Sequence, residues 1–353
     1  MCQQLPGQHD KFGQPANLAK GAELKIGIIG TGIMGTFHAQ CLHESISGAT
    51  VSAIADPNLT RGREVADAVG AIALADPLEL IQHPDVDAVL IASPDAFRAA
   101  QTLACVEAGK PALCEKPLSY SVAEAEQVVK AHREATDGGV PLVYQGFMRR
   151  FDPGYVAQKG AISSGEYGKA LMVHSIGRGV TSGPGATDES VIFNSAIHDL
   201  DIVPWLLDSP VTSVSWLAPE NSSSNTDLHE PFLMLLRTAD GGLSTVEIYL
   251  NARYGYDMRS EVVCENGVIS ITEPHRVAIS SELATKTAIP DDFRPRFADA
   301  YRLELQEWVD ALNEGRAATL ATVEDGAVAT RVAAAAVASM QQHGAFINVK
   351  DVK

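Results

Sequence analysis

A glycine-rich turn gives the chain its clearest chemical signature. Ile28-Ile29-Gly30-Thr31-Gly32-Ile33-Met34-Gly35 reads as an apolar strand that enters a tight turn and then a helix. The first glycine permits the turn, the second lets backbone N–H groups approach a phosphate, and the third lets the helix pack close to the strand. Asp56 ends the next apolar run, about twenty residues beyond the turn, where a carboxylate can bind ribose hydroxyls. The spacing favours a dinucleotide site over an ordinary glycine turn.

A lysine stands at the end of a later expected strand. Cys114-Glu115-Lys116-Pro117 follows the apolar run at 111–114, on the carboxyl edge of the sheet that faces the ligand crevice. From there the amine can reach a nicotinamide and a substrate hydroxyl together. A lone strand-end lysine is more often a solvated charge. Its place in a Glu-Lys-Pro triplet after a dinucleotide turn favours a functional role.

A histidine and an amide share the start of an expected helix, in Asn194-Ser195-Ala196-Ile197-His198-Asp199-Leu200-Asp201. Residues four apart lie on one helical face, so Asn194 and His198 are expected to point together. Asp199 and Asp201 resemble metal ligands beside the histidine, but these helical positions do not converge on one point. No metal is expected.

Length and charge restrict the class of protein. At 353 residues the chain is long enough for two domains with separate cores, and its net charge of −17 disfavours nucleic acid or anionic membranes as partners. No apolar run approaches the roughly 18–20 residues that span a bilayer, and the polar start lacks the apolar core of a signal peptide. Five cysteines form no Cys-x-x-Cys pair, which argues against a disulfide framework or a zinc site. A cytoplasmic location is expected.

The order of segments predicts an α/β fold with two kinds of sheet. Apolar runs at 26–29, 51–55, 88–92, 111–114 and 141–146 alternate with helical stretches, the pattern of a doubly wound, parallel Rossmann sheet. Extended segments near 169–177, 211–218, 231–238, 243–250, 259–265 and 267–272 predict a C-terminal α+β domain with a largely antiparallel, open-faced sheet. Helices are expected near 152–163, 194–207, 292–314 and 323–342.

These segments divide the chain into four expected parts. Residues 1–22 would form a flexible N-terminal extension and 23–146 a dinucleotide-binding Rossmann domain. Residues 147–320 would form a substrate and oligomerisation domain, and 321–353 a C-terminal helix and tail that pack back on the body.

The motifs together resemble the glucose-fructose oxidoreductase and inositol dehydrogenase family, Gfo/Idh/MocA. The resemblance covers the chain after residue 22, through the glycine turn, Asp56, Ser93-Pro94, Glu115-Lys116-Pro117 and Asn194-x-x-x-His198. Within the family, Tyr144-Gln145-Gly146-Phe147-Met148-Arg149-Arg150-Phe151-Asp152 is similar to a segment of inositol 2-dehydrogenases.

The resemblance implies an NAD-dependent dehydrogenase that oxidises a secondary hydroxyl of a cyclic polyol, myo-inositol before others. His198 would act as the general acid/base while a hydride leaves for nicotinamide C4, and Lys116 would hold the reacting oxygen. The family commonly has an aspartate where Asn194 stands, so the substrate stays open. A pyranose or anhydrosugar dehydrogenase is the alternative, and a dinucleotide-binding regulator without turnover is a less favoured one.

The resemblance also implies the site residues and a homotetramer or dimer. The implied catalytic residues are Lys116, His198 and Asn194. Those implied for the cofactor are Gly30, Gly32, Ile33, Met34, Gly35, Asp56, Arg61, Ser93, Glu115 and Lys116. Those implied for the substrate are Lys116, Arg149, Asn194, His198 and Tyr256, with Tyr254 and His174 as further candidates. For the substrate candidates Arg149, His174 and Tyr256, a purely structural role is the alternative.

Overall fold

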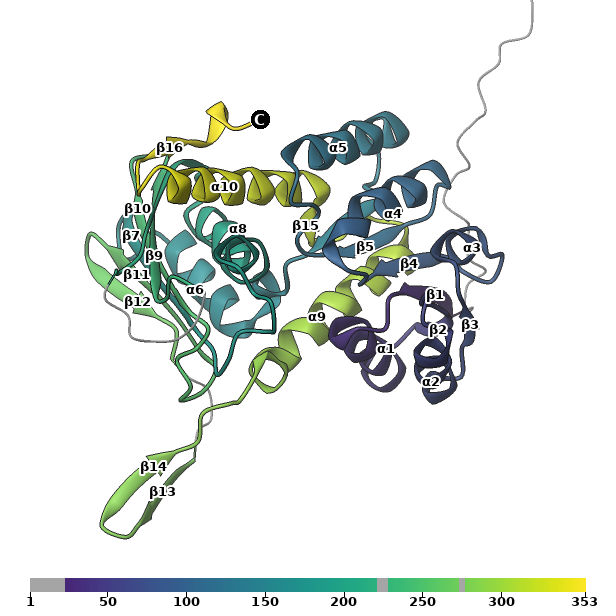
Figure 1. Ribbon diagram of the computed structural model, residues 1–353, viewed down its shortest axis with the longest axis horizontal. Helices are drawn as coiled ribbons and strands as arrows, with labels where there is room; N and C mark the ends of the chain where they lie inside the picture. The colour runs from purple at the N-terminus through teal and green to yellow at the C-terminus, as the bar shows by residue number, and fades with distance from the viewer. Residues whose placement is uncertain (1–22, 221–227, 273–276) are drawn as a thin grey trace, which may run out of the picture. The chain divides into compact units, whose positions relative to one another are not determined.

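The computed structural model describes residues 23–220, 228–272 and 277–353 (Figure 1). Two compact units make up the chain. The first takes the described residues up to Cys114, together with Val128–Tyr144 and Gln306–Thr319; the second takes Glu115–Gln127, Gln145–Leu305 and Leu320–Lys353. The expected extension at 1–22 lies outside the described residues.

A parallel sheet forms the core of the first unit. Its strands are β1 (Leu24–Ile29), β2 (Ala49–Ala55), β3 (Ile72–Leu74), β4 (Ala88–Ile91), β5 (Ala112–Glu115) and β6 (Val143–Gly146). The short edge strand β15 (Ala321–Thr322) of the same sheet consists of residues assigned to the second unit. The order is β15-β6-β5-β4-β1-β2-β3, and the pairs from β5 to β3 are parallel. Because β4 and β5 are buried along their whole length, they read in the sequence as apolar runs, with Glu115 at the end of β5 as the exception.

Helices connect these strands: α1 (Ile33–Ser45), α2 (Leu59–Val69), α3 (Pro77–Gln82), α4 (Asp95–Glu107) and α5 (Val122–Thr136). The alternation of strand and helix confirms the predicted doubly wound sheet. The sequence pattern misses β3 and α3, because three and six residues are too few to show a period.

A second sheet forms the core of the second unit. Its strands are β7 (Ala170–Arg178), β8 (Val211–Leu217), β9 (Phe232–Thr238), β10 (Leu243–Tyr249), β11 (Asp257–Cys264), β12 (Gly267–Ser270) and β16 (Ile347–Asn348). In the order β12-β11-β7-β10-β9-β8-β16, only β7 and β10 run parallel. The predicted, largely antiparallel sheet is confirmed.

The two faces of this sheet differ. Along β10, buried Ser244, Val246 and Ile248 alternate with half-buried residues that face the other way. Figure 1 shows α6 (Pro153–Ser163), α8 (Ile197–Leu207) and α10 (Val323–Gln341) on one face. The opposite face carries no helix of the described residues of this unit.

Shorter elements complete the second unit. They are the 3₁₀-helices η1 (Met148–Phe151) and η3 (Val349–Asp351), the helix α7 (Asp188–Val191), the π-helix η2 (Ile192–Ala196) and a hairpin of β13 (Ala278–Ser281) with β14 (Ala284–Thr287). Helix α9 (Phe293–Glu314) has a kink at Phe297 and passes from the second unit into the first.

The helix expected at 194–207 begins earlier and is not uniform. A capping box at Thr187, whose hydroxyl accepts a hydrogen bond from the Ser190 N–H, starts α7. The chain then widens into η2, which contains Asn194, before α8 continues to Leu207. The Asn194–His198 stretch is therefore not the regular α-helix that the sequence predicts.

Candidate active site

The glycine turn of the first unit has the shape that a bound pyrophosphate needs. Gly30 has φ +93°, and a Cβ atom there would lie 2.8 Å from the Ala92 carbonyl oxygen. A Cβ at Gly35 would overlap the carbonyl oxygen of Gly30, whereas one at Gly32 would meet nothing within 4 Å. Gly32 caps α1 without a side chain, so the first N–H groups of the helix stay available to an anion.

Asp56 ends β2 with a fixed carboxylate. Its Oδ2 accepts hydrogen bonds from the Thr31 hydroxyl at 2.6 Å and the Thr31 N–H at 2.8 Å, and its Oδ1 accepts one from the Asn58 N–H at 2.8 Å. Burial opposes the charge, but these hydrogen bonds outweigh it and lower the pKa of Asp56; the positive charge of Arg61 acts in the same direction. The carboxylate is half-buried and ionised, as binding a ribose diol requires.

Ser93 lies after β4 in the same unit. Its hydroxyl donates to Gln101 Oε1 at 2.6 Å, and its carbonyl accepts from Arg98 Nε at 2.9 Å. Ile33, whose side chain is exposed, is the first residue of α1 and directly follows the N-cap residue Gly32. The turn, Asp56 and this strand end together fit a dinucleotide.

Lys116 and Asn194 meet within the second unit. Lys116 follows β5, and its Nζ donates a hydrogen bond to the Asn194 carbonyl oxygen at 2.8 Å. That carbonyl belongs to η2, and π-turns of this kind frequently occur at functional sites. The Asn194 amide donates from Nδ2 to the Tyr120 hydroxyl at 2.7 Å, and the Tyr120 ring stacks on Phe193 at 4.4 Å between centroids.

His198 lies one turn further on, in the first turn of α8. Its side chain is 8% exposed, and its ring meets the edge of Phe147 with 6.3 Å between centroids. Its Nδ1 is buried without a hydrogen-bond partner among the described residues. Burial first, and then the positive charges of Lys116 and Arg149, lower the pKa of His198 well below its ordinary value of 6.5. The imidazole is therefore neutral at physiological pH.

The other predicted substrate residues occupy different places. Arg149 is buried, and its Nη1 pairs with Asp199 Oδ1 at 2.6 Å. Tyr256 is half-buried against the edge of Phe297, and burial raises its pKa to about 12.

Two weaker candidates lie away from this cluster. The His174 ring is bonded to Thr245 Oγ1 at 2.8 Å, and Ser175, its neighbour on β7, points to the helix-covered face and donates to Asp199 Oδ1 at 2.5 Å. Because neighbouring side chains on a strand point to opposite faces, His174 points to the open face of the sheet. Tyr254 is exposed and donates to Asp257 Oδ2 at 2.5 Å.

Glu115, which the resemblance implies as a cofactor residue, acts on two buried acidic groups that the sequence analysis misses, Tyr301 and Glu304. Its Oε2 accepts the Lys116 N–H at 3.1 Å, and its carboxylate raises the pKa of both Tyr301 and Glu304, each already raised by burial. Both carboxyl oxygens of Glu304 are buried without a hydrogen-bond partner among the described residues. The sequence offers one signal for this group: a glutamate within an otherwise apolar stripe of α9.

Comparison with known proteins assigns the family. Residues 24–138 match the oxidoreductase family with an NAD-binding Rossmann fold, and residues 159–349 match its C-terminal alpha/beta domain. The chain belongs to the Gfo/Idh/MocA family of oxidoreductases. The resemblance predicted from the glycine turn and the Glu-Lys-Pro triplet is confirmed.

Relatives within the Gfo/Idh/MocA family cover nearly the whole chain. It is 47% identical over 329 residues to inositol 2-dehydrogenase 2 of Paenarthrobacter aurescens, covering 92% of this chain and 98% of that protein. It is 41% identical over 330 residues to inositol 2-dehydrogenase 1 of Saccharopolyspora erythraea, covering 93% and 96%. The crystal structure of myo-inositol dehydrogenase from Lactobacillus casei with NAD(H) and myo-inositol superposes with a TM-score of 0.88 at 29% identity, covering 92% and 96%.

Two further findings concern only the described residues. They contain no group of three or more His, Cys, Asp or Glu side chains placed to hold a metal ion. None of their helices combines the length and hydropathy that crossing a membrane would require.

Proposed function

We propose that this chain oxidises one secondary hydroxyl of a cyclic polyol, with NAD as hydride acceptor and myo-inositol, giving the 2-keto inosose, as the first substrate to test. The observation that carries the proposal is the cluster in which Lys116 Nζ contacts the Asn194 carbonyl while the neutral His198 lies one turn away. The names of the relatives, inositol 2-dehydrogenases at up to 47% identity, support the substrate class.

His198 is the proposed general base. A neutral imidazole takes the proton of the substrate hydroxyl while the carbon gives up a hydride to the nicotinamide, so one proton and one hydride leave the alcohol and a ketone remains. Its depressed pKa keeps the imidazole free of a proton, and the neutral amide of Asn194 does not raise that pKa as a carboxylate would. Burial also excludes water from the proton transfer.

Lys116 is the proposed electrostatic partner of the reacting oxygen. Its ammonium group can exchange the Asn194 carbonyl for the substrate oxygen, and it stabilises the negative charge that develops there. Asn194 then positions Lys116, because its carbonyl oxygen accepts the Lys116 hydrogen bond while its own amide is held by the Tyr120 hydroxyl.

The first unit would hold NAD through Gly30, Gly32, Gly35, the first N–H groups of α1 at Ile33 and Met34, and Asp56. When bound, NAD supplies a nicotinamide that accepts the hydride at C4. The fixed negative charge of Asp56 opposes a 2′-phosphate, so the chain would select NAD over NADP.

A substrate panel tests this function. Purified protein is mixed with myo-inositol, scyllo-inositol, pyranoses and an anhydrosugar, each with NAD and with NADP, and reduced nicotinamide is followed by its absorbance. Turnover of an inositol with NAD is the expected result. Turnover of pyranoses alone would assign a sugar dehydrogenase, and NAD binding without turnover of any substrate would assign a regulator.

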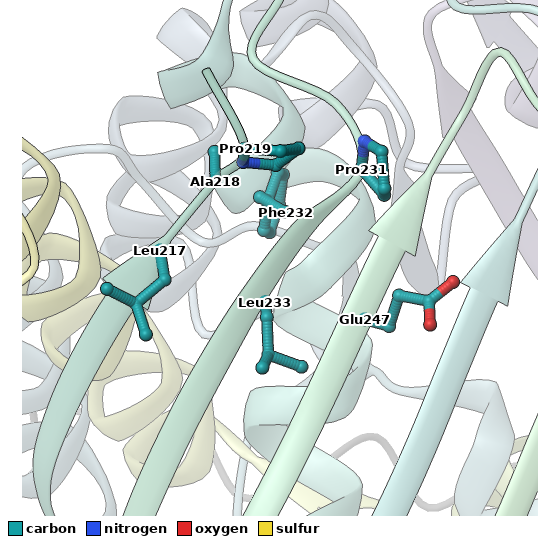
Figure 2. Close-up of a pocket in the computed structure, with 7 residues that line it drawn as sticks. All are labelled: Leu217, Ala218, Pro219, Pro231, Phe232, Leu233 and Glu247. Atoms are coloured by element: carbon teal, nitrogen blue, oxygen red, sulfur yellow. The ribbon is translucent and has the colours of Figure 1, made fainter. Parts of the chain in front are cut away.

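The open face of the second sheet is proposed as the contact between copies in a homotetramer or dimer. A largely apolar pocket of about 300 Å³ lies there. Figure 2 shows the residues that line it: Leu217, Ala218, Pro219, Pro231, Phe232, Leu233 and Glu247. Leu217 is 43% exposed, and uncovered apolar side chains around such a pocket are typical of subunit contacts. Light scattering on Leu217→Glu is expected to show a smaller assembly than wild type; equal masses would contradict the proposal.

A cytoplasmic location stays a prediction from composition.

A further inference from the structure

Two consecutive arginines of η1 each bind an aspartate of α8. Arg149 Nη1 lies 2.6 Å from Asp199 Oδ1, and Arg150 binds both oxygens of Asp201, at 2.5 Å and 3.0 Å. The aspartates follow His198 by one and three positions, so the two ion pairs fix the turn of helix that presents the imidazole. Neither pair is explained by the proposed proton transfer itself.

The surroundings of Arg149 leave it no freedom to move. The side chain is 4% exposed, its Nη2 lies 3.5 Å from Met258 Sδ, and the rings of Tyr155 and Phe297 lie 5.9 Å from its Cζ. Asp199 is 1% exposed and also accepts the Ser175 hydroxyl. Leaving a buried carboxylate without its cation is costly, so Arg149 is not free to exchange Asp199 for a substrate hydroxyl.

We propose that Arg149 is a positioning residue for His198: its ion pair with Asp199, the next residue on α8, orients the imidazole and holds a fixed positive charge near the ring. This role rests on the proposed function of His198 as the base. It replaces direct substrate binding, the role that the sequence implies for Arg149.

The charges around His198 make the role specific to Arg149. Lys116, which follows β5, and Arg149, in η1, are the cations that face the ring, and both lower the pKa of His198. Asp199 neighbours it on α8 but is already paired with Arg149, and Asn194 and Phe147 contribute no charge. Lys116 must interact with substrate, so its field at the ring changes during the reaction, whereas Arg149 supplies a constant one.

Arg150 provides a matched control within the same motif. It is also largely buried and pairs with an aspartate of the same helix, and it makes a second contact with Asp325 at 3.2 Å. Its charge is not among those that lower the pKa of His198. Losing Arg150 therefore tests the mechanical effect of breaking a clamp on α8 without the electrostatic effect on the imidazole.

The decisive experiment is an NMR titration of His198 in protein carrying isotope-labelled histidine, with the signal assigned by its loss in His198→Gln. In Arg149→Gln the midpoint is expected to rise by about one pH unit, because a nearby cation has been removed. In Arg150→Gln and in Arg149→Lys, which keeps a charge, the midpoint is expected to stay at the wild-type value. Asp199→Asn is expected to move it the other way, since the arginine charge is then uncompensated.

The result can overturn the proposal even if one variant fails to fold. An unchanged midpoint in folded Arg149→Gln, an equal rise in Arg150→Gln, or a rise in Asp199→Asn would each contradict it. The titration requires no turnover, so a failure of the proposed dehydrogenase activity is recognised separately. With an active substrate, the pH at which kcat/KM falls in acid should shift in each variant as the NMR midpoint of His198 does. Arg149→Lys should leave that pH unchanged but lower kcat, because the imidazole is less well oriented.

Discussion

Asp56 of the first unit and Asp199 of the second are both carboxylates next to a predicted site, but their partners differ. Asp56 accepts hydrogen bonds from neutral donors, the Thr31 hydroxyl and two backbone N–H groups, and stays half-buried. Asp199 is buried and paired with the cation of Arg149. The charge of Asp56 can therefore interact with a ligand, whereas the charge of Asp199 is neutralised by Arg149 inside the protein.

The difference indicates how each unit builds its site. The first presents backbone N–H groups and one carboxylate held by neutral hydrogen-bond donors, a surface that recognises phosphates and hydroxyls. The second uses ion pairs to hold the helix that carries a buried, neutral histidine, with the half-buried Lys116 bound to a carbonyl one turn before it, which suits proton transfer. Variants in the second unit should therefore affect chemistry, and variants in the first should affect the choice of cofactor.

The largest effect is expected for His198→Ala. Loss of a general base typically lowers kcat/KM by about 10²–10⁴-fold. Wild-type polyol oxidation should rise with pH through one ionisation that lies below the ordinary histidine value of 6.5, because only the neutral imidazole accepts the proton and its pKa is lowered. Steady-state rates across pH measure both effects. His174→Ala, on the open face of the sheet, is the control and should keep its activity; a His198→Ala enzyme of near wild-type activity would assign the base elsewhere.

Lys116→Met should come next, with a loss of about 10²–10³-fold in kcat, the range for one electrostatic contact to the reacting oxygen. NAD binding should stay close to wild type, because the glycine turn and Asp56 carry it; fluorescence quenching on NAD addition checks this. Lys159→Met is the control, since Lys159 pairs with Asp208 at 2.5 Å in the same unit. Retention of more than about a tenth of kcat would be incompatible with the several kcal/mol that this role implies.

The two sites also differ in how far the sequence predicts them. The glycine turn depends on neighbouring residues and on the φ of Gly30, so a local pattern suffices. The Arg149–Asp199 pair joins residues 50 positions apart, and Asn194 meets Tyr120 across 74. The hydrophobic periodicity of a sequence does not predict contacts between residues so far apart. The π-helix that contains Asn194 also has no local sequence signal here, so the regular α-helical geometry expected for Asn194 and His198 is wrong in detail.

A smaller effect is expected at Asp56, and it separates the two units most directly. Wild type should prefer NAD over NADP by at least about tenfold in kcat/KM, or roughly 1.4 kcal/mol, because the carboxylate repels a 2′-phosphate. Asp56→Ser should reduce this preference while leaving the pH dependence of oxidation unchanged. Arg61→Ala is the companion variant, since the charge of Arg61 acts on Asp56 and offsets some of the repulsion. Equal kcat/KM values with both cofactors in wild type would contradict the role of Asp56.

The smallest effect concerns stability and compares two glutamates of α9, Glu304 in the second unit and Glu307 in the first. Burial, Glu115 and Asp201 raise the pKa of Glu304 well above its ordinary 4.5, whereas its bond with Arg316 lowers that of Glu307 to about 2. A raised carboxyl pKa means that the folded state binds the proton more tightly, so stability falls as pH rises above the unfolded value. A lowered one gives stability above the unfolded value that is lost in acid.

Glu304→Gln, which stays neutral, should therefore melt at a higher temperature than wild type in alkaline buffer and at the same temperature near pH 4. The gain in the free energy of unfolding in alkaline buffer should reach up to about 1.4 kcal/mol for each unit by which the pKa of Glu304 is raised. Glu307→Gln should show the reverse, melting below wild type at neutral pH and approaching it as the pH falls toward 2. Thermal melts of the three proteins across pH measure this. If Glu304→Gln were less stable than wild type at every pH, Glu304 would be ionised and paired in the folded protein, and its buried, unpartnered oxygens would need another explanation.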